Sequence, residues 1–483
     1  MRVALRFWPA LLALGPSLVA AQDCVAVRVG TVNQVNAGTP TEVTYIQNGA
    51  EITCPGGKRL IANQATMVKS VGRIDLIGNV TYRDGERALT AQRAEYYKIQ
   101  QHIHATGDVV IRDLETGSTI HGQEINYYQA SSTRPEALLE AIPSTVRPRA
   151  ILRDERRART GPDSIAGARR PPRSTGDSTT VVADMIQLLG DRHFRGLGSA
   201  EITRESLKAY GGIADYDQDT GELQLTVQGR VEGSEYQLLG DTIKAGLRED
   251  TLREVTAYHN GKLTTAEVTV EAPLIRIELA AGQVERMTAV RPRPPGNAAL
   301  LPPQPRIVAE EFRLSADSID VRAPGQELEE VIAIGDAYSS TNDTIPAPPD
   351  VGELEAQLST DWMRGDTVHA YFSANPRAET DTAANRRVLD RVVSSGSPAS
   401  SLYRRRELPA PPAAGVPVAP TDSTQAAPTA QYEIGYLLAR RIEVIMAEGE
   451  VRDVNASQDV RGVYLQPRSA RGTQGARRNG QRP

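Results

Sequence analysis

The sequence predicts an all-β protein of stacked antiparallel strands, interrupted by Pro- and Arg-rich loops and followed by a disordered tail. Apolar residues alternate along many short segments, a glycine recurs near the middle of several of them, and turn dipeptides separate them. Aromatic residues make up only 5% of the 483 residues, whereas Gly and Pro are frequent. Such a composition favours many short strands and turns over large helical cores.

Repeated glycines are the most specific part of this pattern. Successive side chains of a strand point to opposite faces, so each alternating segment has one apolar face. A glycine in mid-strand weakens the strand unless the backbone bends there or another group approaches closely. Gly78 and Gly107 are 29 residues apart, and repetition near this period is typical of a stack of β units. The segments are Ile74–Tyr82, Ile103–Ile111, Phe194–Ile202, Leu223–Val231 with Gly229 as its glycine, and the weaker Val331–Ala337.

Turns and breaks divide the chain between these segments. Asp84-Gly85 and Asn260-Gly261 favour tight turns that match the twist of the flanking strands. Proline removes strand hydrogen bonds, so Pro-rich stretches without apolar periodicity are predicted as loops or disordered insertions. These stretches are 131–180, 291–306, 341–352 and 406–430.

The N-terminus has the features of a secretory signal peptide. Arg2 and Arg6 precede an apolar stretch, and small residues end at Ala21, so we expect cleavage after Ala21 and export. Two prolines interrupt a run too short to span a bilayer, which argues against a membrane anchor. Asp23 precedes Cys24, which argues against a lipoprotein.

The two cysteines, Cys24 and Cys54, both lie near the expected mature N-terminus. In an oxidising compartment they can form a disulfide, and closing a loop of this size would contribute roughly 3 kcal/mol. The alternative is two unpaired thiols without a role.

Nothing in the sequence predicts an enzyme, a cofactor or a metal site. Asp215–Gly221 resembles the start of a calcium loop, but its glycine is one position late and a hairpin turn explains it better. His102 and His104 share one strand face, which we expect to point to solvent. The net charge of −5 is too small to indicate by itself a polyanionic or polycationic partner. The arginine-rich stretch 147–173 is interpreted as a solvated loop, with contact to a lipid head group or a partner as the alternative.

The repeated unit resembles the OstA-like (organic solvent tolerance) family. The resemblance rests on Ala-x-x-Ala-x-x-Tyr followed by Ile-x-Leu-x-Gly-Asn-Val-x-Tyr. It is best over residues 43–128, fair over 181–290, and looser over 307–340 and 358–374. It implies modules of stacked antiparallel strands that form an open β-jellyroll with an apolar groove for acyl chains. It also implies a periplasmic role in carrying lipopolysaccharide to the outer membrane, with no catalytic residues.

On this basis the sequence is divided as follows: signal peptide 1–21, β-jellyroll module 22–130, insertion 131–180, second module 181–290, further repeats 307–405, linker 406–430, closing strands 431–467 and basic disordered tail 468–483. The expected partners are lipopolysaccharide or a similar amphiphilic glycolipid, an outer-membrane barrel, inner-membrane export components and, through edge strands, further copies of the chain. No nucleic acid is expected. The residues expected to line the groove are Ile74, Leu76, Val80, Tyr82, Ile103, Val109, Ile111, Leu223, Leu225 and Val227.

The sequence allows two interpretations of the space between the strands. Small inward residues such as Ala105, Ala200 and Ala333 leave volume that close packing does not tolerate. Either the opposite strands close in, or an apolar ligand fills the space. The first reading predicts a structural scaffold of the cell envelope with a dry core, and the second predicts a lipid carrier.

Overall fold

The structure is a computed structural model that describes residues 23–153, 178–190, 192–204, 207–248, 251–280, 282–293, 301–309, 312–341, 360–375, 386–406, 432–447 and 450–465. The predicted signal peptide, the predicted tail and all of the 406–430 linker except Arg406 lie outside these residues.

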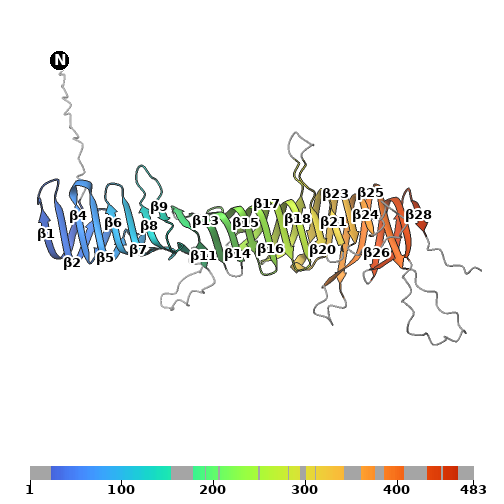
Figure 1. Cartoon of the computed structure of the whole chain (residues 1–483), viewed down its shortest axis with the longest axis horizontal. Coiled ribbons are helices and arrows are strands. Elements are labelled where there is room, and N and C mark those ends of the chain that lie inside the picture. Colours follow the sequence, from blue (N-terminus) through green and yellow to red (C-terminus); the bar gives the residue numbers. More distant parts are fainter. Residues whose placement is uncertain are drawn as a thin grey trace, which may run out of the picture. The chain divides into compact units, whose positions relative to one another are not determined.

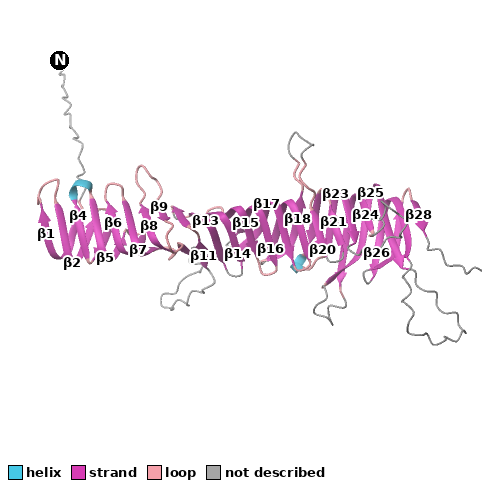
Figure 2. Cartoon of the chain, viewed as in Figure 1, coloured by secondary structure: helices cyan, strands magenta, loops and turns pink. Residues whose placement is uncertain are grey.

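The predicted all-β fold of stacked antiparallel strands is confirmed (Figure 2). Within the described ranges the only helical segments are two 3₁₀ turns, Lys69–Val71 and Pro324–Gln326. The chain forms two compact units, Met1–Asp191 and Arg192–Pro483. In each unit, strands that follow one another in the sequence lie side by side (Figure 1).

The first unit contains β1 (Val25–Val35), β2 (Val43–Cys54), β3 (Lys58–Ala62), β4 (Gln64–Val68), β5 (Arg73–Arg83), β6 (Arg87–Tyr97), β7 (His102–Asp113), β8 (Thr119–Tyr128), β9 (Leu138–Ala141), β10 (Arg149–Arg153), β11 (Ser178–Val182) and β12 (Met185–Leu189).

The second unit contains β13 (His193–Arg204), β14 (Leu207–Asp217), β15 (Glu222–Glu232), β16 (Tyr236–Arg248), β17 (Thr251–Thr265), β18 (Val268–Ala280), β19 (Gln283–Val290), β20 (Arg306–Ala309), β21 (Phe312–Ser315), β22 (Ser318–Arg322), β23 (Glu330–Thr341), β24 (Trp362–Ala374), β25 (Arg387–Arg406), β26 (Tyr432–Ala447), β27 (Glu450–Ser457) and β28 (Arg461–Leu465).

Long strands bend near their middle. On β5 the pairing with β6 shifts between Ile77 and Val80, where Gly78 and Asn79 have φ values of 81° and 49°. In the first unit the bends create two layers. The first layer contains β4, residues 73–77 of β5 and the segments paired with them, and the second layer contains β3, residues 80–83 of β5 and their partners. Equivalent bends with positive φ occur at Gly107–Asp108, Gly198–Ser199 and Gly335–Asp336.

Gly78 shows why glycine recurs at this place. A Cβ at Gly78 would lie 2.7 Å from Nδ2 of Asn63, which stands between β3 and β4. The backbone N–H of Asn63 donates to the carbonyl oxygen of Gly78 at 2.8 Å, which fixes the close approach. Both reasons considered for a mid-strand glycine, a bend and a close approach, therefore apply here.

The two layers of the first unit pack face to face through the apolar side of each strand. The ring of Tyr82 in the second layer lies 6.2 Å from that of Tyr96 and 6.3 Å from that of Tyr127, both in the first layer. All three tyrosines are almost completely buried. The core of the unit is therefore the space between the layers.

The prediction that residues 131–180 form only loops or a disordered insertion is wrong. This range contains β9, β10 and the start of β11, and the unit extends to Asp191 instead of ending near 130. Leu139 and Ala141 of β9, and Ala150 and Leu152 of β10, are buried and alternate with less buried residues. Of the prolines in this range that the structure describes, Pro135, Pro143 and Pro148 all stand outside the strands, so they interrupt no hydrogen bond of the layers. Residues 154–177 lie outside the described part of the chain.

At the end of the second unit, β26, β27 and β28 occupy the range 431–467 in which the sequence predicted closing strands. β26 pairs with β25 on one side and with both β27 and β28 on the other. Every residue of β28 is exposed.

Candidate functional site

Nine of the ten residues predicted to line a groove lie in the interior, each at most 8% exposed. They are Ile74, Leu76, Val80, Tyr82, Ile103, Val109, Ile111, Leu223 and Leu225. The alternation of apolar residues therefore identified the inward face of these strands.

The prediction for the tenth residue, Val227, is wrong, because this residue is 63% exposed. The bend of β15 lies at Val227 and Gln228, each with φ of 62°, and not at Gly229. Gly229 is buried and does not form the bend. A larger residue would be crowded there, because a Cβ would lie 3.0 Å from Cγ1 of Ile243 on the next strand. The bend turns Val227 outward although the alternation places it inward.

At the three small inward residues named above, the protein itself excludes solvent. Ala105 and Ala333 are 0% exposed and Ala200 is 2% exposed. The layers thus close over these positions, as close packing requires.

An open cavity of about 610 Å³ lies at the N-terminal end of the first unit. It opens where the strand ends of the two layers face each other. Ile74 and Tyr96, two inward residues of the first layer, form part of its wall. The other lining residues are Asp23, Cys24, Glu42, Thr44, Pro55, Lys58, Met67, Val68, Lys69, Gly72, Arg73, Lys98, Ile99 and Gln101. Its volume is within the range of small-molecule sites in proteins.

Basic side chains surround the mouth of this cavity. Arg73 pairs with Asp75 at 2.8 Å, and Lys69 lies 4.0 Å from Glu42. Burial lowers the pKa of the Lys58 ammonium, an effect that the nearby Asp84 carboxylate partly opposes. An ammonium group withdrawn from water favours an anionic partner.

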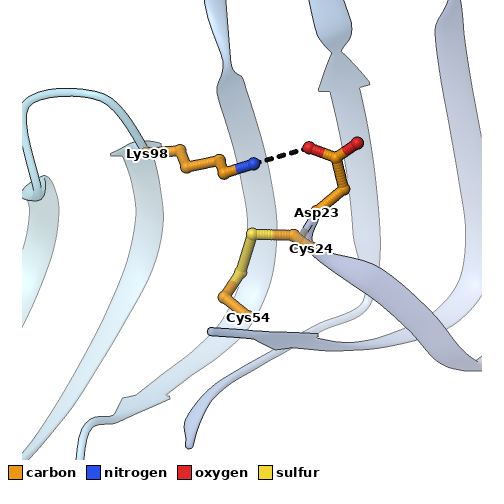
Figure 3. Close-up of a disulfide and its surroundings, with 4 residues drawn as sticks. All are labelled: Asp23, Cys24, Cys54 and Lys98. Atoms are coloured by element: carbon orange, nitrogen blue, oxygen red, sulfur yellow. Dashed lines mark hydrogen bonds and ion pairs between the residues drawn. A yellow bond between two sulfur atoms is a disulfide. The ribbon is translucent and has the colours of Figure 1, made fainter. Parts of the chain in front are cut away.

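One ion pair joins the two sides of the mouth, and a disulfide lies beside it on one of these sides (Figure 3). Cys24 and Cys54 form a disulfide at the strand ends of the second layer, as the sequence predicted. Asp23, beside Cys24, accepts a hydrogen bond of 2.5 Å from Nζ of Lys98, which follows β6 in the first layer. This bond, with the charge of Lys98, lowers the pKa of Asp23. Asp23 and Lys98 therefore bridge the entrance.

A group of buried tyrosines lies behind the cavity. We call Tyr82, Tyr96 and Tyr127 the tyrosine cluster. Asp84 accepts hydrogen bonds from the hydroxyls of Tyr82 at 3.1 Å and Tyr127 at 2.9 Å, and from Nε2 of Gln129 at 3.1 Å. Burial raises the pKa of all three tyrosines, that of Tyr96 to about 12. The hydroxyls of Tyr82 and Tyr127 therefore stay protonated and able to donate to the Asp84 carboxylate.

The two histidines singled out in the sequence lie on the outer face of the first layer. The ring of His102 stacks between Tyr97, at 5.5 Å, and Tyr128, at 4.1 Å, and its Nε2 lies 2.9 Å from Oδ1 of Asn126. Nε2 of His104 lies 3.0 Å from a carboxylate oxygen of Glu124. The described residues contain no cluster of three side chains suited to a metal ion.

Asp217 and Asp219, from the stretch that resembles a calcium loop, lie at the turn between β14 and β15. Oδ1 of Asp217 accepts backbone hydrogen bonds from Asp219 and Thr220, which is the geometry of a turn. Of the arginine-rich stretch 147–173, only residues 147–153 are described.

Three important residues were not predicted from the sequence: Lys58 and Lys98, which line the cavity, and Asp84, which lies behind it. Tyr96 could have been found, because it continues the apolar face of β6. The basic residues carry no such signal, since they lie at strand ends, as Lys58 does, or in the adjoining turns, as Lys98 does.

Comparisons with protein-family models and with curated proteins find no match to this chain. The described part of the chain contains no helix with the length and hydropathy required to cross a bilayer.

Proposed function

We propose that this protein is a non-enzymatic periplasmic carrier that binds lipopolysaccharide or a similar amphiphilic glycolipid on its way to the outer membrane. The observation that carries the proposal is the cavity at the N-terminal end of the first unit. Inward apolar side chains line its interior, and Lys58, Lys69, Arg73 and Lys98 contribute to its lining. An amphiphile with an acyl chain and an anionic head group has the complementary chemistry.

The energetics of such a ligand support the same conclusion. Each buried methylene contributes about 0.8 kcal/mol, so a short length of hydrocarbon gives substantial affinity. Anionic groups at the mouth would gain charge-assisted hydrogen bonds from Lys58, and from Lys98 in place of its bond to Asp23. The resemblance of residues 43–128 to OstA-like proteins and the expected signal peptide support the periplasmic location.

Exposed edge strands support the expected protein partners. Among the described residues, β1 pairs only with β2, and five of its valines are 43–59% exposed. An unpaired apolar edge favours the addition of another strand. We propose that β1 receives a strand from a membrane-bound export component, from the outer-membrane barrel or from another copy of the chain.

A direct test is to purify the protein gently from the periplasm and to identify bound amphiphiles by mass spectrometry. We expect glycolipid to co-purify with the wild type, and much less with the double variant Lys58→Glu and Lys98→Glu. Lys208→Glu, an exposed change in the second unit, is the matched control and should retain the lipid. Equal lipid content in the three proteins would contradict the proposal.

The packed interior favours a second candidate, a structural scaffold of the envelope. Ile103, Ala105 and Leu225 are at most 1% exposed without any ligand. This candidate predicts that no amphiphile co-purifies and that none binds to the purified protein in titrations.

A further inference from the structure

We propose that the tyrosine cluster sets the maximum length of hydrocarbon chain that the N-terminal cavity accepts. This inference rests on the proposed function and specifies its ligand. It assigns to Tyr82, Tyr127, Asp84 and Gln129 a role in specificity, although none of these residues lines the cavity.

Among the inward residues that line the cavity, Tyr96 on β6 lies furthest along the stack of strands. This residue lines the cavity and is only 2% exposed. Behind it the ring of Tyr82 lies 6.2 Å away, and the ring of Tyr127 packs edge-on against Tyr82 at 6.3 Å. Three aromatic rings thus occupy the space between the layers that an extended hydrocarbon chain would have to enter.

Hydrogen bonds between the layers hold this barrier in place. Asp84 stands at the turn between β5 and β6 in the second layer, and Gln129 follows β8 in the first layer. They are joined directly at 3.1 Å, and Gln129 also donates to the hydroxyl of Tyr82. The mouth is open beside Lys58 and Gln101, and the next strand ends along the stack are Asp84 and Gln129. The layers are therefore separated by the cavity beside Lys58 and Gln101. At the next strand ends, the hydrogen bond between Asp84 and Gln129 joins them.

These hydrogen bonds between the layers are strong enough to keep the layers together when a ligand is bound. Gln129 is 7% exposed, and Asp84 also accepts backbone hydrogen bonds from Glu86 and Arg87 at 3.2 Å and 2.8 Å. Separating the layers here would leave buried donors without acceptors, which costs far more than the burial of one further methylene returns. A ligand chain should therefore stop at Tyr96.

The test measures the affinity of the full chain for straight-chain fatty acids from octanoate to stearate, each below its micelle concentration. In the wild type we expect affinity to rise about fourfold for each added methylene, and then to become constant at a limiting length. Tyr82→Ala should move this limit to longer chains, and Tyr82→Leu provides a second, less disruptive variant. Tyr82→Phe, which keeps the ring, should keep the wild-type limit.

Tyr236→Ala is the matched control, because Tyr236 is a buried tyrosine of the second unit. It should leave the limiting length unchanged. A wild-type affinity that rises without a limit, or a limit that neither Tyr82→Ala nor Tyr82→Leu moves, would overturn the inference while the proposed function stands. Absence of binding at every chain length would remove the proposed function and this inference with it.

Discussion

Replacing Asp84 by alanine should destabilise the first unit by about 4 kcal/mol. Asp84→Ala removes the acceptor shared by the hydroxyls of Tyr82 and Tyr127 and the amide of Gln129. A buried donor left without an acceptor costs about 1–3 kcal/mol. Gln129 and Tyr82 can still bond to each other, so the three losses are less than additive. The remaining cost is a large part of the 5–15 kcal/mol that is typical of a whole domain.

Hydrogen exchange measured by mass spectrometry can assign this loss to the first unit. Amides of β6 and β8 that exchange through opening of the layers should do so about a thousand times faster in Asp84→Ala, since 1.4 kcal/mol corresponds to a factor of ten. Amides of β16 and β17 in the second unit should keep their wild-type rates. Trp362 also belongs to the second unit, so its fluorescence gives an independent check that this unit is unchanged.

Glu95→Ala is the matched control for Asp84→Ala. Glu95 accepts a hydrogen bond of 2.5 Å from the hydroxyl of Tyr97, but on the outer face of the first layer, where water can replace it. We expect this change to cost less than about 1 kcal/mol. If Asp84→Ala and Glu95→Ala accelerate exchange equally, or if neither does, Asp84 does not hold the two layers together.

Three further predictions follow from single positions. Val227→Asn should stabilise the second unit by about 1 kcal/mol in denaturant unfolding, because asparagine tolerates the left-handed backbone at this bend; Leu225→Asn should destabilise it strongly, and equal losses for both would contradict the assigned bend. Replacing Cys24 and Cys54 by serine should cost about 3–4 kcal/mol, because the disulfide closes a 30-residue separation; a midpoint that matches that of the oxidised wild type would contradict this. Burial lowers the pKa of His102 from 6.5, so its contribution to stability is complete above pH 6.5 and is lost as the pH falls through the lower folded pKa. His102→Gln should flatten the dependence of the unfolding free energy on pH, and an unchanged slope would show that His102 does not cause it.

Much of the candidate site could be predicted from alternation, but its boundaries could not. Ile74 and Tyr82 are buried as expected, because strand geometry alone places alternate side chains on one face. Val227 was placed on the wrong face, because the bend of β15 lies at Val227 and Gln228 and not at Gly229. The alternation of apolar residues is the same for both positions of the bend, so it could not distinguish them. The strands of 131–180 were missed, because their apolar runs are short and the prolines at their borders dominated the prediction.

The sequence by itself determined the strands, their apolar faces and the bends at Gly78 and Gly107, because these depend on sterics and on contacts between neighbouring segments. The tertiary structure alone decided where the two layers close and where they stay apart. Asp84 and Gln129 are 45 residues apart in the chain, yet their hydrogen bond fastens the layers beside an open cavity. A contact of this kind depends on how two layers meet, and no local periodicity encodes it.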